Sequence, residues 1–271
     1  MLSDITIGQY YKADSLIHRL DARTKILLTL WAIVMIFLCK NFFSLLFVLL
    51  FTALCVILSK VPFKMFFKSL KPIVPIIIFT SVLNIFYIKD GEALVTLGSF
   101  SITDKGASTA VFMSVRIITL IVISSILTYT TVPTQLTDAI EKLLSPLKVL
   151  HIEVHTLAMM MTLALRFIPT LIEEIQRITN AQKARGADLE NGKLKERVKA
   201  MIPILIPLFV SAFSRAYELA FAMSCRCYRG GEGRTRMKQM KMSTRDFLSF
   251  FVFALSTVAV VLLNHYFKAV I

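Results

Sequence analysis

Long apolar runs separated by short basic stretches are the dominant pattern of this chain. A helix that crosses a bilayer needs ~20 mostly apolar residues. Runs of about this length predict membrane helices at residues 22–39, 42–59, 72–89, 107–131 and 247–267. Pro72 and Pro75 fall near the start of the third run, where a missing backbone N–H is tolerated. The pattern therefore predicts an all-α integral membrane protein with about five spans.

Residues 132–243 differ from the rest of the chain. They have helical periodicity, but five prolines and a high density of charge interrupt it. Helical pieces are expected at about 134–150, 151–185 and 194–226. We favour a cytoplasmic three-helix domain with long amphipathic helices at the membrane surface, and one or two additional spans are the alternative. The expected division is a membrane region (1–131), this cytoplasmic domain (132–243) and a C-terminal membrane helix (244–271).

Composition and charge agree with a membrane location. The chain has 271 residues, is 56% hydrophobic and carries a formal net charge of +14. Of its 31 basic residues, 26 lie in the N-terminal stretch, in residues 59–71 and in residues 132–245. Because basic residues accumulate on the cytoplasmic side, we expect a cytoplasmic N-terminus and an external C-terminus in the cell membrane. Topology explains this charge, so no nucleic-acid partner is expected. The first 25 residues lack a cleavable signal peptide.

Motifs for catalysis or nucleotide binding are missing from the sequence. It has no G-x-x-x-x-G-K-[ST], no H-E-x-x-H and no G-x-S-x-G. His151 and His155 have i,i+4 spacing, but Glu153 lies on another face, so we interpret them as interfacial polar residues. The four cysteines are expected to be reduced thiols. We therefore predict a protein that is not an enzyme and binds no metal.

Arg116 is the one ionisable residue well inside a predicted span. A charge within the membrane is costly and commonly functional. Its long side chain could instead reach the membrane surface. A paired, buried role and a snorkelling role both remain open.

Two long helices of the predicted cytoplasmic domain end in a similar way. One ends at Ala184-Arg185-Gly186, and the other at Cys225-Arg226-Cys227, 41 positions later. An arginine between small residues can enter a groove and make bidentate hydrogen bonds to carboxylates or carbonyls. Ordinary stabilisation of the helix dipole by a cation is the alternative for each one alone. As a matched pair, they indicate two copies of one docking element.

With these helix ends, the chain resembles the transmembrane T components (EcfT- or CbiQ-like proteins) of energy-coupling-factor transporters. Residues 15–25, Ser-Leu-Ile-His-Arg-Leu-Asp-Ala-Arg-Thr-Lys, are similar to the family's N-terminal motif, where position 22 is more often proline. Residues 181–186 resemble its first Ala-Arg-Gly motif, and residues 222–231 resemble its second. In the second motif, Cys225 and Cys227 stand where alanine and glycine are usual. The matching residues span nearly the whole chain.

The resemblance implies a non-catalytic subunit that transmits motion. Its partners would be two cytosolic ABC ATPases, expected to form a heterodimer, and one membrane-embedded S component that binds a vitamin or another micronutrient. ATP and Mg²⁺ would be bound by the ATPases, and this chain would need no cofactor. The residues that would dock on the ATPases are Ala184, Arg185, Gly186, Cys225, Arg226 and Cys227.

Methionine-rich faces are the candidate contact with the S component. Methionine forms adaptable surfaces, which suit partners that exchange. The candidates are Met159, Met160 and Met161. Packing of helix against helix is the alternative role for each of them.

Three rival functions remain. A T component dedicated to cobalt or nickel uptake would look the same, because metal selectivity would lie on another subunit. A polytopic membrane enzyme would require clustered side chains, and only His151, Glu153 and His155 come near that. A secondary transporter would have paired halves or polar residues at mid-membrane, and the sequence has no internal repeat.

Overall fold

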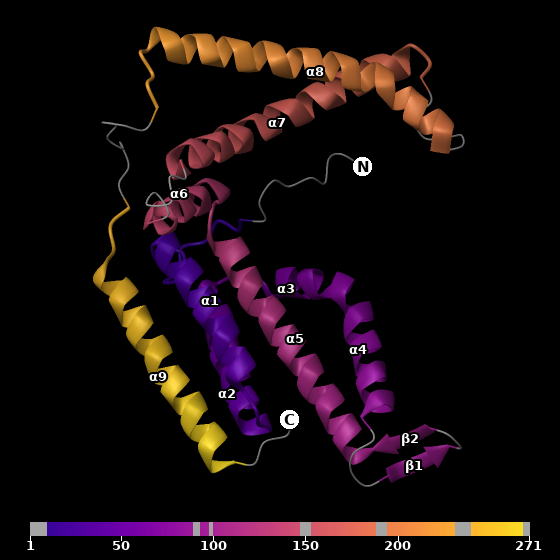
Figure 1. The fold of residues 1–271 in the computed structure, drawn as a ribbon, viewed down its shortest axis with the longest axis vertical. Coiled ribbons are helices and arrows are strands. Elements are labelled where there is room, and N and C mark those ends of the chain that lie inside the picture. The colour runs from indigo at the N-terminus through magenta and orange to yellow at the C-terminus, as the bar shows by residue number, and fades with distance from the viewer. Residues whose placement is uncertain are drawn as a thin grey trace. The chain divides into compact units, whose positions relative to one another are not determined.

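The computed structural model describes residues 10–88, 93–97, 100–146, 153–187, 194–230 and 240–267. The chain forms two compact units. We call Gly8–Leu136 with Gln239–Ile271 the bundle unit, and the part built on Thr137–Lys238 the paired-helix unit. Helices make up nearly all of the described residues, which confirms the all-α membrane fold class (Figure 1).

The bundle unit holds six α-helices, a 3₁₀ turn and one hairpin among its described residues. In chain order they are α1 (Ala22–Leu38), α2 (Phe42–Ser59), α3 (Phe63–Leu70), η1 (Lys71–Ile73), α4 (Val74–Tyr87), β1 (Ala93–Leu97), β2 (Phe100–Thr103), α5 (Asp104–Thr130) and α9 (Thr244–Tyr266), and the first residues of α6 (Pro133–Leu143) also belong here. Helices α1, α2, α5 and α9 pack together, and α4 packs on α5. Helix α9, near the C-terminus, thus packs against α1 and α2 from the N-terminal part of the chain.

Side-chain caps fix where these helices begin. The Asp21 carboxylate accepts the N–H of Arg23 at the start of α1, and the Thr103 hydroxyl accepts the N–H of Gly106 at the start of α5. Asn41 and Ser243 form capping boxes that start α2 and α9. These interactions satisfy backbone donors that the first helical turn leaves unpaired.

Apolar side chains from four helices form the main core of the bundle unit. Met35, Ile36, Val48, Phe112 and Val260 are each fully buried there. Close packing also explains why α5 has a glycine at position 106. A side chain at Gly106 would place its Cβ 3.1–3.2 Å from the carbonyl oxygens of residues 88 and 85, so α5 approaches the end of α4 closely only because Cβ is absent.

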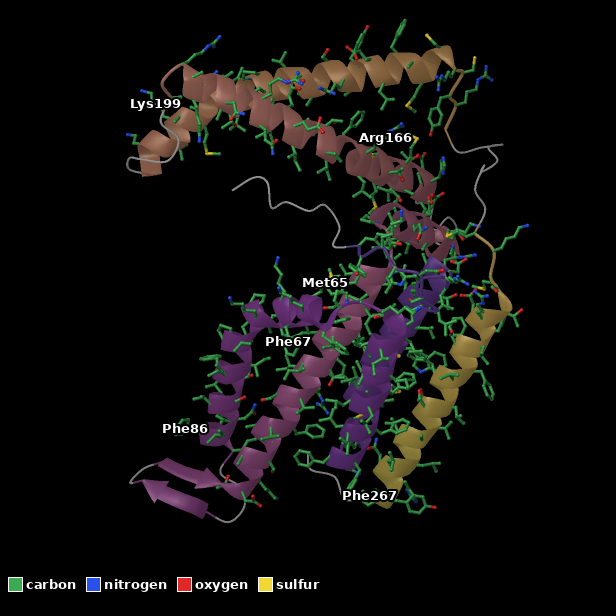
Figure 2. All side chains as sticks on the ribbon, turned by 180° about the vertical axis from the view of Figure 1, so that it is seen from behind. Met65, Phe67, Phe86, Arg166, Lys199 and Phe267 are labelled. Carbon is green, nitrogen blue, oxygen red and sulfur yellow. The ribbon has the colours of Figure 1, made fainter. Side chains whose placement is uncertain are left out.

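Two features of the bundle unit differ from the sequence-based prediction. The basic segment at residues 59–71, which lies outside the predicted spans, contains helix α3, and its lysines at 64 and 68 have the i,i+4 spacing of one helix face. Figure 2 shows Met65 and Phe67 on this helix; Phe67 is 71% exposed. The segment between the predicted spans at 72–89 and 107–131 contains the antiparallel β1–β2 hairpin.

The paired-helix unit consists of the rest of α6, α7 (Val154–Ala184) and α8 (Leu194–Cys225). Helices α7 and α8 run antiparallel. Near one end of the pair, the Tyr228 hydroxyl donates to the Met159 sulfur over 2.9 Å; further along, Arg215 Nη2 lies 3.2 Å from Glu174 Oε2. Figure 1 shows that α8 bends in its first half, the part that holds the prolines at 203 and 207.

Six helical segments of the described residues are long and apolar enough to cross a membrane. They are Phe42–Ser59, Phe63–Tyr87, Asp104–Thr130, Val154–Ala184, Val198–Cys225 and Thr244–Tyr266. Four of the five predicted spans are among them, and α1, with 17 residues, is shorter than all six. Because α7 and α8 also qualify, their placement along the membrane surface stays a prediction.

Candidate functional site

The C-terminal end of α7 closes with a Schellman motif. The N–H of Ala187 donates to the carbonyl of Gln182 over 3.0 Å, and the N–H of Gly186 donates to the carbonyl of Lys183 over 3.0 Å. This pattern requires a left-handed residue just after the C-cap, and Gly186 supplies it with φ +82°. Arg185 is the C-cap residue itself.

The C-terminal end of α8 repeats this geometry at every position. The N–H of Tyr228 donates to the carbonyl of Met223 over 3.1 Å, and the N–H of Cys227 donates to that of Ser224 over 3.0 Å. Cys227 takes the left-handed conformation with φ +55°, although it has a Cβ. Arg226 therefore occupies the position that Arg185 occupies on α7.

Both arginines lie at the helix ends without a partner among the described residues. Arg185 and Arg226 are exposed, as are their neighbours at 184, 186, 225 and 227. Within the described ranges, neither guanidinium makes a hydrogen bond or an ion pair. Since the last carbonyls of each helix already accept backbone N–H groups, the side chains are not needed to cap them. Each guanidinium keeps its full set of donors for another molecule.

The antiparallel arrangement of α7 and α8 separates the two arginines. Helices of 31 and 32 residues have lengths of about 45–50 Å at the ~1.5 Å rise per residue of an α-helix. Because the helices run in opposite directions, their C-terminal ends lie at opposite ends of the pair. Figure 1 shows this arrangement. A partner at one arginine would leave the other arginine free for a second partner.

The three candidate methionines of α7 fall into two groups. Met159 is partly buried, and its sulfur accepts the hydrogen bond from Tyr228 just beyond α8. Met160 and Met161 are 50% and 45% exposed. Within this unit, Met159 joins the two helices, while Met160 and Met161 present surface to the outside.

The exposed face of α8 carries a larger apolar surface, which the sequence-based analysis did not identify. Its members recur every three or four residues, the spacing that places side chains on one face of a helix. They are Val198, Ile202, Leu205, Phe209, Phe213, Tyr217 and Phe221, and they are 42–74% exposed. We call this set the α8 stripe. A contiguous exposed apolar surface of this kind marks contact with a membrane or a protein partner.

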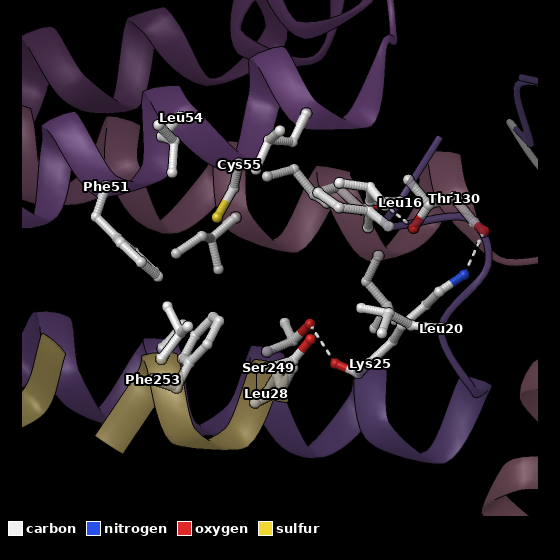
Figure 3. A pocket seen from close by; sticks show the side chains of 18 of the residues that line it. Leu16, Leu20, Lys25, Leu28, Phe51, Leu54, Cys55, Thr130, Ser249 and Phe253 are labelled. Carbon is white, nitrogen blue, oxygen red and sulfur yellow. Dashed lines mark hydrogen bonds between the residues drawn. The ribbon is translucent and has the colours of Figure 1, made fainter. Parts of the chain in front are cut away.

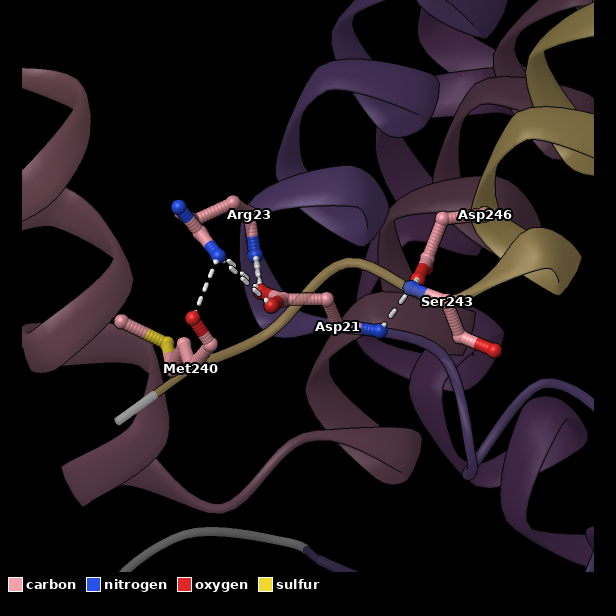
Figure 4. Close-up of polar contacts among 5 residues, drawn as sticks. All are labelled: Asp21, Arg23, Met240, Ser243 and Asp246. Atoms are coloured by element: carbon pink, nitrogen blue, oxygen red, sulfur yellow. Dashed lines mark hydrogen bonds and ion pairs between the residues drawn. The ribbon is translucent and has the colours of Figure 1, made fainter. Parts of the chain in front are cut away.

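The N-terminal motif at residues 15–25 joins the start of α1 to the start of α9. Figure 4 shows the contacts. The buried Asp246 carboxylate accepts the backbone N–H groups of Asp21 over 3.0 Å and of Ser243 over 2.7 Å. Arg23 Nη2 lies 2.9 Å from Asp21 Oδ2 and donates to the Met240 carbonyl over 3.1 Å. In the bundle unit, this motif fixes the start of α1 against the start of α9.

Lys25 extends the same network to the end of α5. Its ammonium group donates to the carbonyls of Thr130 over 2.8 Å and His18 over 3.2 Å, and only 5% of the residue is exposed. Two or more carbonyl acceptors compensate a buried cation for part of its lost hydration.

His18 and Asp14 belong to the same N-terminal segment. His18 Nε2 donates to the Tyr11 carbonyl over 2.9 Å, which leaves Nδ1 to accept from the Ser15 hydroxyl over 2.7 Å. Burial lowers the pKa of His18 below its ordinary value. Arg19, which donates two hydrogen bonds to Asp14, lowers the pKa of that carboxyl group.

Arg116 reaches back to the end of α1. Its Nη2 donates to the Cys39 carbonyl over 2.5 Å, and its guanidinium lies 4.7 Å from the centre of the Phe112 ring. Cys39 ends α1, so Arg116 supplies a donor to one of the carbonyls that a helix C-terminus leaves free. These contacts are neutral groups of its own unit and the residue is partly buried, so the choice between the paired, buried role and the snorkelling role stays open.

His155 and Glu153, which the sequence predicts to be interfacial polar residues, have separate partners in the described residues. His155 Nδ1 lies 3.1 Å from Glu141 Oε1 on α6, while Glu153 accepts from the Thr156 hydroxyl. His151 lies outside the described residues.

Comparison with known proteins gives long matches. Residues 13–237 match the family model CbiQ, described as "Cobalt transport protein". Relatives from Ruminiclostridium cellulolyticum, Clostridium kluyveri and Bacillus subtilis are 50%, 49% and 46% identical to this chain. The matches cover 92%, 92% and 91% of this chain and 92%, 93% and 93% of the relatives. All three relatives are named "Energy-coupling factor transporter transmembrane protein EcfT".

Proposed function

The chain belongs to the family of energy-coupling factor transporter transmembrane proteins, and we propose that it couples two cytosolic ABC ATPases to a substrate-binding S component. ATP and Mg²⁺ are bound by the ATPases in this proposal, and this chain contributes no catalytic group or cofactor. Its N-terminus is cytoplasmic and its C-terminus external. The S component recognises a vitamin or another micronutrient.

The observation that carries this proposal is the repeated geometry of the two arginine caps. Arg185 and Arg226 occupy the same position of the same motif, are exposed, and lie at opposite ends of an antiparallel helix pair. Two similar grooves, one on each ATPase, would fit such a pair. A planar guanidinium can make two parallel hydrogen bonds to a carboxylate in each groove, which a lysine cannot do.

The α8 stripe and the exposed Met160 and Met161 are the proposed contact for the S component. A long apolar helix face can slide along a partner within the membrane surface, because apolar contacts impose little directional constraint. Motion of α7 or α8, driven by the ATPases at the arginine caps, would then reach the S component along the whole length of the helix.

The proposal is tested with Arg185→Ala, Arg226→Ala and the double variant in cells that contain all the subunits. Loss of a buried, hydrogen-bonded charge at an interface costs about 2–5 kcal/mol. We therefore expect weaker ATPase copurification in each single variant, and loss of both copurification and uptake in the double variant. Arg226→Lys should recover only part of the affinity.

Arg229→Ala is the matched control. Arg229 is exposed and lies three residues beyond Arg226, but it is not a helix C-cap residue. It should retain normal copurification and uptake. Normal ATPase binding and uptake in the double arginine variant would refute the proposal.

Cobalt or nickel uptake is a second candidate, because the matching family model is described by cobalt transport. Uptake of radiolabelled cobalt and of labelled vitamins by the same cells distinguishes the two substrates. Both outcomes leave the role of the two arginines unchanged.

A further inference from the structure

An apolar cavity of about 270 Å³ lies inside the bundle unit, between α1, α2, α5, α9 and the N-terminal segment. Figure 3 shows its walls. Leu28, Phe51, Cys55, Ile126 and Phe253 are among the side chains that line it. The cavity is larger than the ~150 Å³ apolar cavity that takes up benzene in another protein. It lies among helices whose surroundings are hydrocarbon.

The polar side chains of the cavity wall at Thr29, Ser249 and Lys25 have partners. The Thr29 hydroxyl donates to the Lys25 carbonyl over 2.8 Å, and the Ser249 hydroxyl donates to the Arg245 carbonyl over 2.9 Å. The Lys25 ammonium donates to the carbonyls of Thr130 and His18. A polar solute would therefore find almost no donors here, and water would lack the partners it needs. The cavity suits a hydrocarbon group.

The cavity is open at its edge, and a cation lies there that has no partner within the described ranges. Leu16, Leu54 and Leu248 line the cavity and are each more than half exposed, so a long ligand can extend out of it. Arg245, in the first turn of α9, also lines it and is exposed. No described residue forms a hydrogen bond or ion pair with the Arg245 side chain.

The acidic groups next to Arg245 do not neutralise it. The Asp246 carboxylate is 1% exposed and accepts backbone N–H groups, and Asp21 pairs with Arg23. An anion at the mouth of the cavity would meet the free guanidinium directly. A single ligand that combines a hydrocarbon chain with an anion would satisfy both the cavity and Arg245.

We propose that this cavity holds one acyl chain of an anionic phospholipid whose phosphate group binds Arg245. The volume is below the ~300 Å³ at which pockets for drug-sized molecules begin, so it fits one chain and not a bulky ligand. The second acyl chain stays in the bilayer. The bound lipid fills a space between four helices that no described side chain of the bundle unit fills.

The only tryptophan of the chain reports on this site. Trp31 lies on α1 between the cavity-lining residues 29 and 32, and its indole N–H donates to the Thr257 hydroxyl on α9 over 3.0 Å. Bromine atoms on an acyl chain quench tryptophan fluorescence at short range. The full-length protein is reconstituted in phosphatidylcholine vesicles that contain increasing fractions of phosphatidylglycerol brominated on its acyl chains.

We expect quenching of Trp31 that saturates at a low fraction of brominated phosphatidylglycerol. Unbrominated phosphatidylglycerol should reverse it, and phosphatidylcholine should not. Cys55→Phe fills the cavity and should abolish the saturable part, whereas Ile57→Phe, on the exposed face of the same helix, should retain it. Ser249→Phe fills the cavity from α9 and serves as a second variant if Cys55→Phe does not fold.

Arg245→Gln tests the headgroup. One basic residue near an anionic surface changes affinity about fivefold, so in this variant half of the saturable quenching should require about a fivefold higher fraction of brominated phosphatidylglycerol. Lys241→Gln, exposed and outside the cavity wall, should behave as the wild type.

Two outcomes would overturn the proposal. One is quenching that rises in proportion to the total bromine content and is the same in Cys55→Phe and Ile57→Phe. The other is loss of the saturable part when the full transporter is assembled, which would assign the cavity to a segment of a partner subunit. The proposal concerns the bundle unit only, so its failure leaves the coupling role of Arg185 and Arg226 untouched.

Discussion

Replacing Gly186 with alanine should loosen the end of α7 by about 1 kcal/mol. Gly186 has φ +82°, and a Cβ placed there would meet no atom within 4 Å, so the penalty comes from the backbone alone. The left-handed conformation costs an L-residue about 1–2 kcal/mol. Alanine recovers about 0.4–1 kcal/mol by restricting the unfolded chain. The net loss of about 1 kcal/mol corresponds to about fivefold more frequent opening of the cap.

The same reasoning predicts the opposite sign at the end of α8. Cys227 already adopts φ +55° with a side chain present. Cys227→Gly removes the left-handed penalty but adds freedom to the unfolded chain. The net effect should stabilise this cap by about 0.5–1 kcal/mol, which makes its opening about two to five times rarer.

Amide hydrogen exchange of the purified protein measures both effects. The reporter amides are those of Ala187 and Tyr228, which close the two Schellman motifs. Exchange at residue 187 should be about fivefold faster in Gly186→Ala, and exchange at residue 228 should be slower in Cys227→Gly. Gly230→Ala is the control, since Gly230 has φ +87° but makes none of these capping hydrogen bonds. Unchanged exchange in Gly186→Ala, or faster exchange in Cys227→Gly, would refute the reasoning.

Three further substitutions test the bundle unit by thermal unfolding of the purified protein. Arg116→Met should destabilise it by about 1.5–3 kcal/mol, because a charged hydrogen bond to the Cys39 carbonyl is lost, and Arg116→Lys should lose less; equal stability of wild type and Arg116→Met would contradict this. Asp246→Ala should lower the free energy of unfolding by about 2–4 kcal/mol, since two backbone N–H groups lose their acceptor. Asp246→Asn keeps one acceptor oxygen, so its stability should lie between those of the wild type and Asp246→Ala. Because the folded pKa of His18 is lowered from 6.5, the unfolded chain takes up a proton first as the pH falls. The stability contributed by the neutral ring is therefore complete above pH 6.5 and lost as the pH falls toward the lower folded pKa, and His18→Gln should flatten this part of the pH profile.

Helix positions could be predicted well where one physical signal dominates. Apolar runs located α2, α5 and α9 to within a few residues, because burial in hydrocarbon decides these segments. The family was also identified correctly from its short motifs, as the relatives confirm. Helix α3 was missed because lysines at 64 and 68 made an amphipathic helix resemble a basic loop.

The hairpin before α5 could have been predicted from the sequence. Two short runs rich in β-branched and aromatic residues flank Gly98-Ser99, and two residues of this type commonly join antiparallel strands. The α8 stripe could likewise be found from its spacing alone. Charges and prolines interrupt the stripe along α8 without removing it, and they hide it when they are taken as the main signal of this region.

Contacts between residues far apart in sequence could not be predicted. The sequence identified Arg116 as costly but left its role open, because its partner is a backbone carbonyl 77 positions away. The motif at residues 15–25 was recognised by resemblance, yet its bond to Asp246 spans 225 positions. Such pairings depend on how the helices pack, which a local pattern does not contain.

The two arginine caps show which backbone conformation the residue after each arginine must adopt. The sequence pattern places small residues beside each arginine, and Cys227 departs from the glycine that is usual in the second motif. The structure gives both motifs the same hydrogen bonds and the same left-handed residue. The position after each arginine is therefore defined by its backbone conformation, which glycine adopts freely and Cys227 adopts at a cost. The two caps of this chain have the same geometry and the same arginine, whereas the residue after the arginine differs. The arginine is therefore the feature that both caps share.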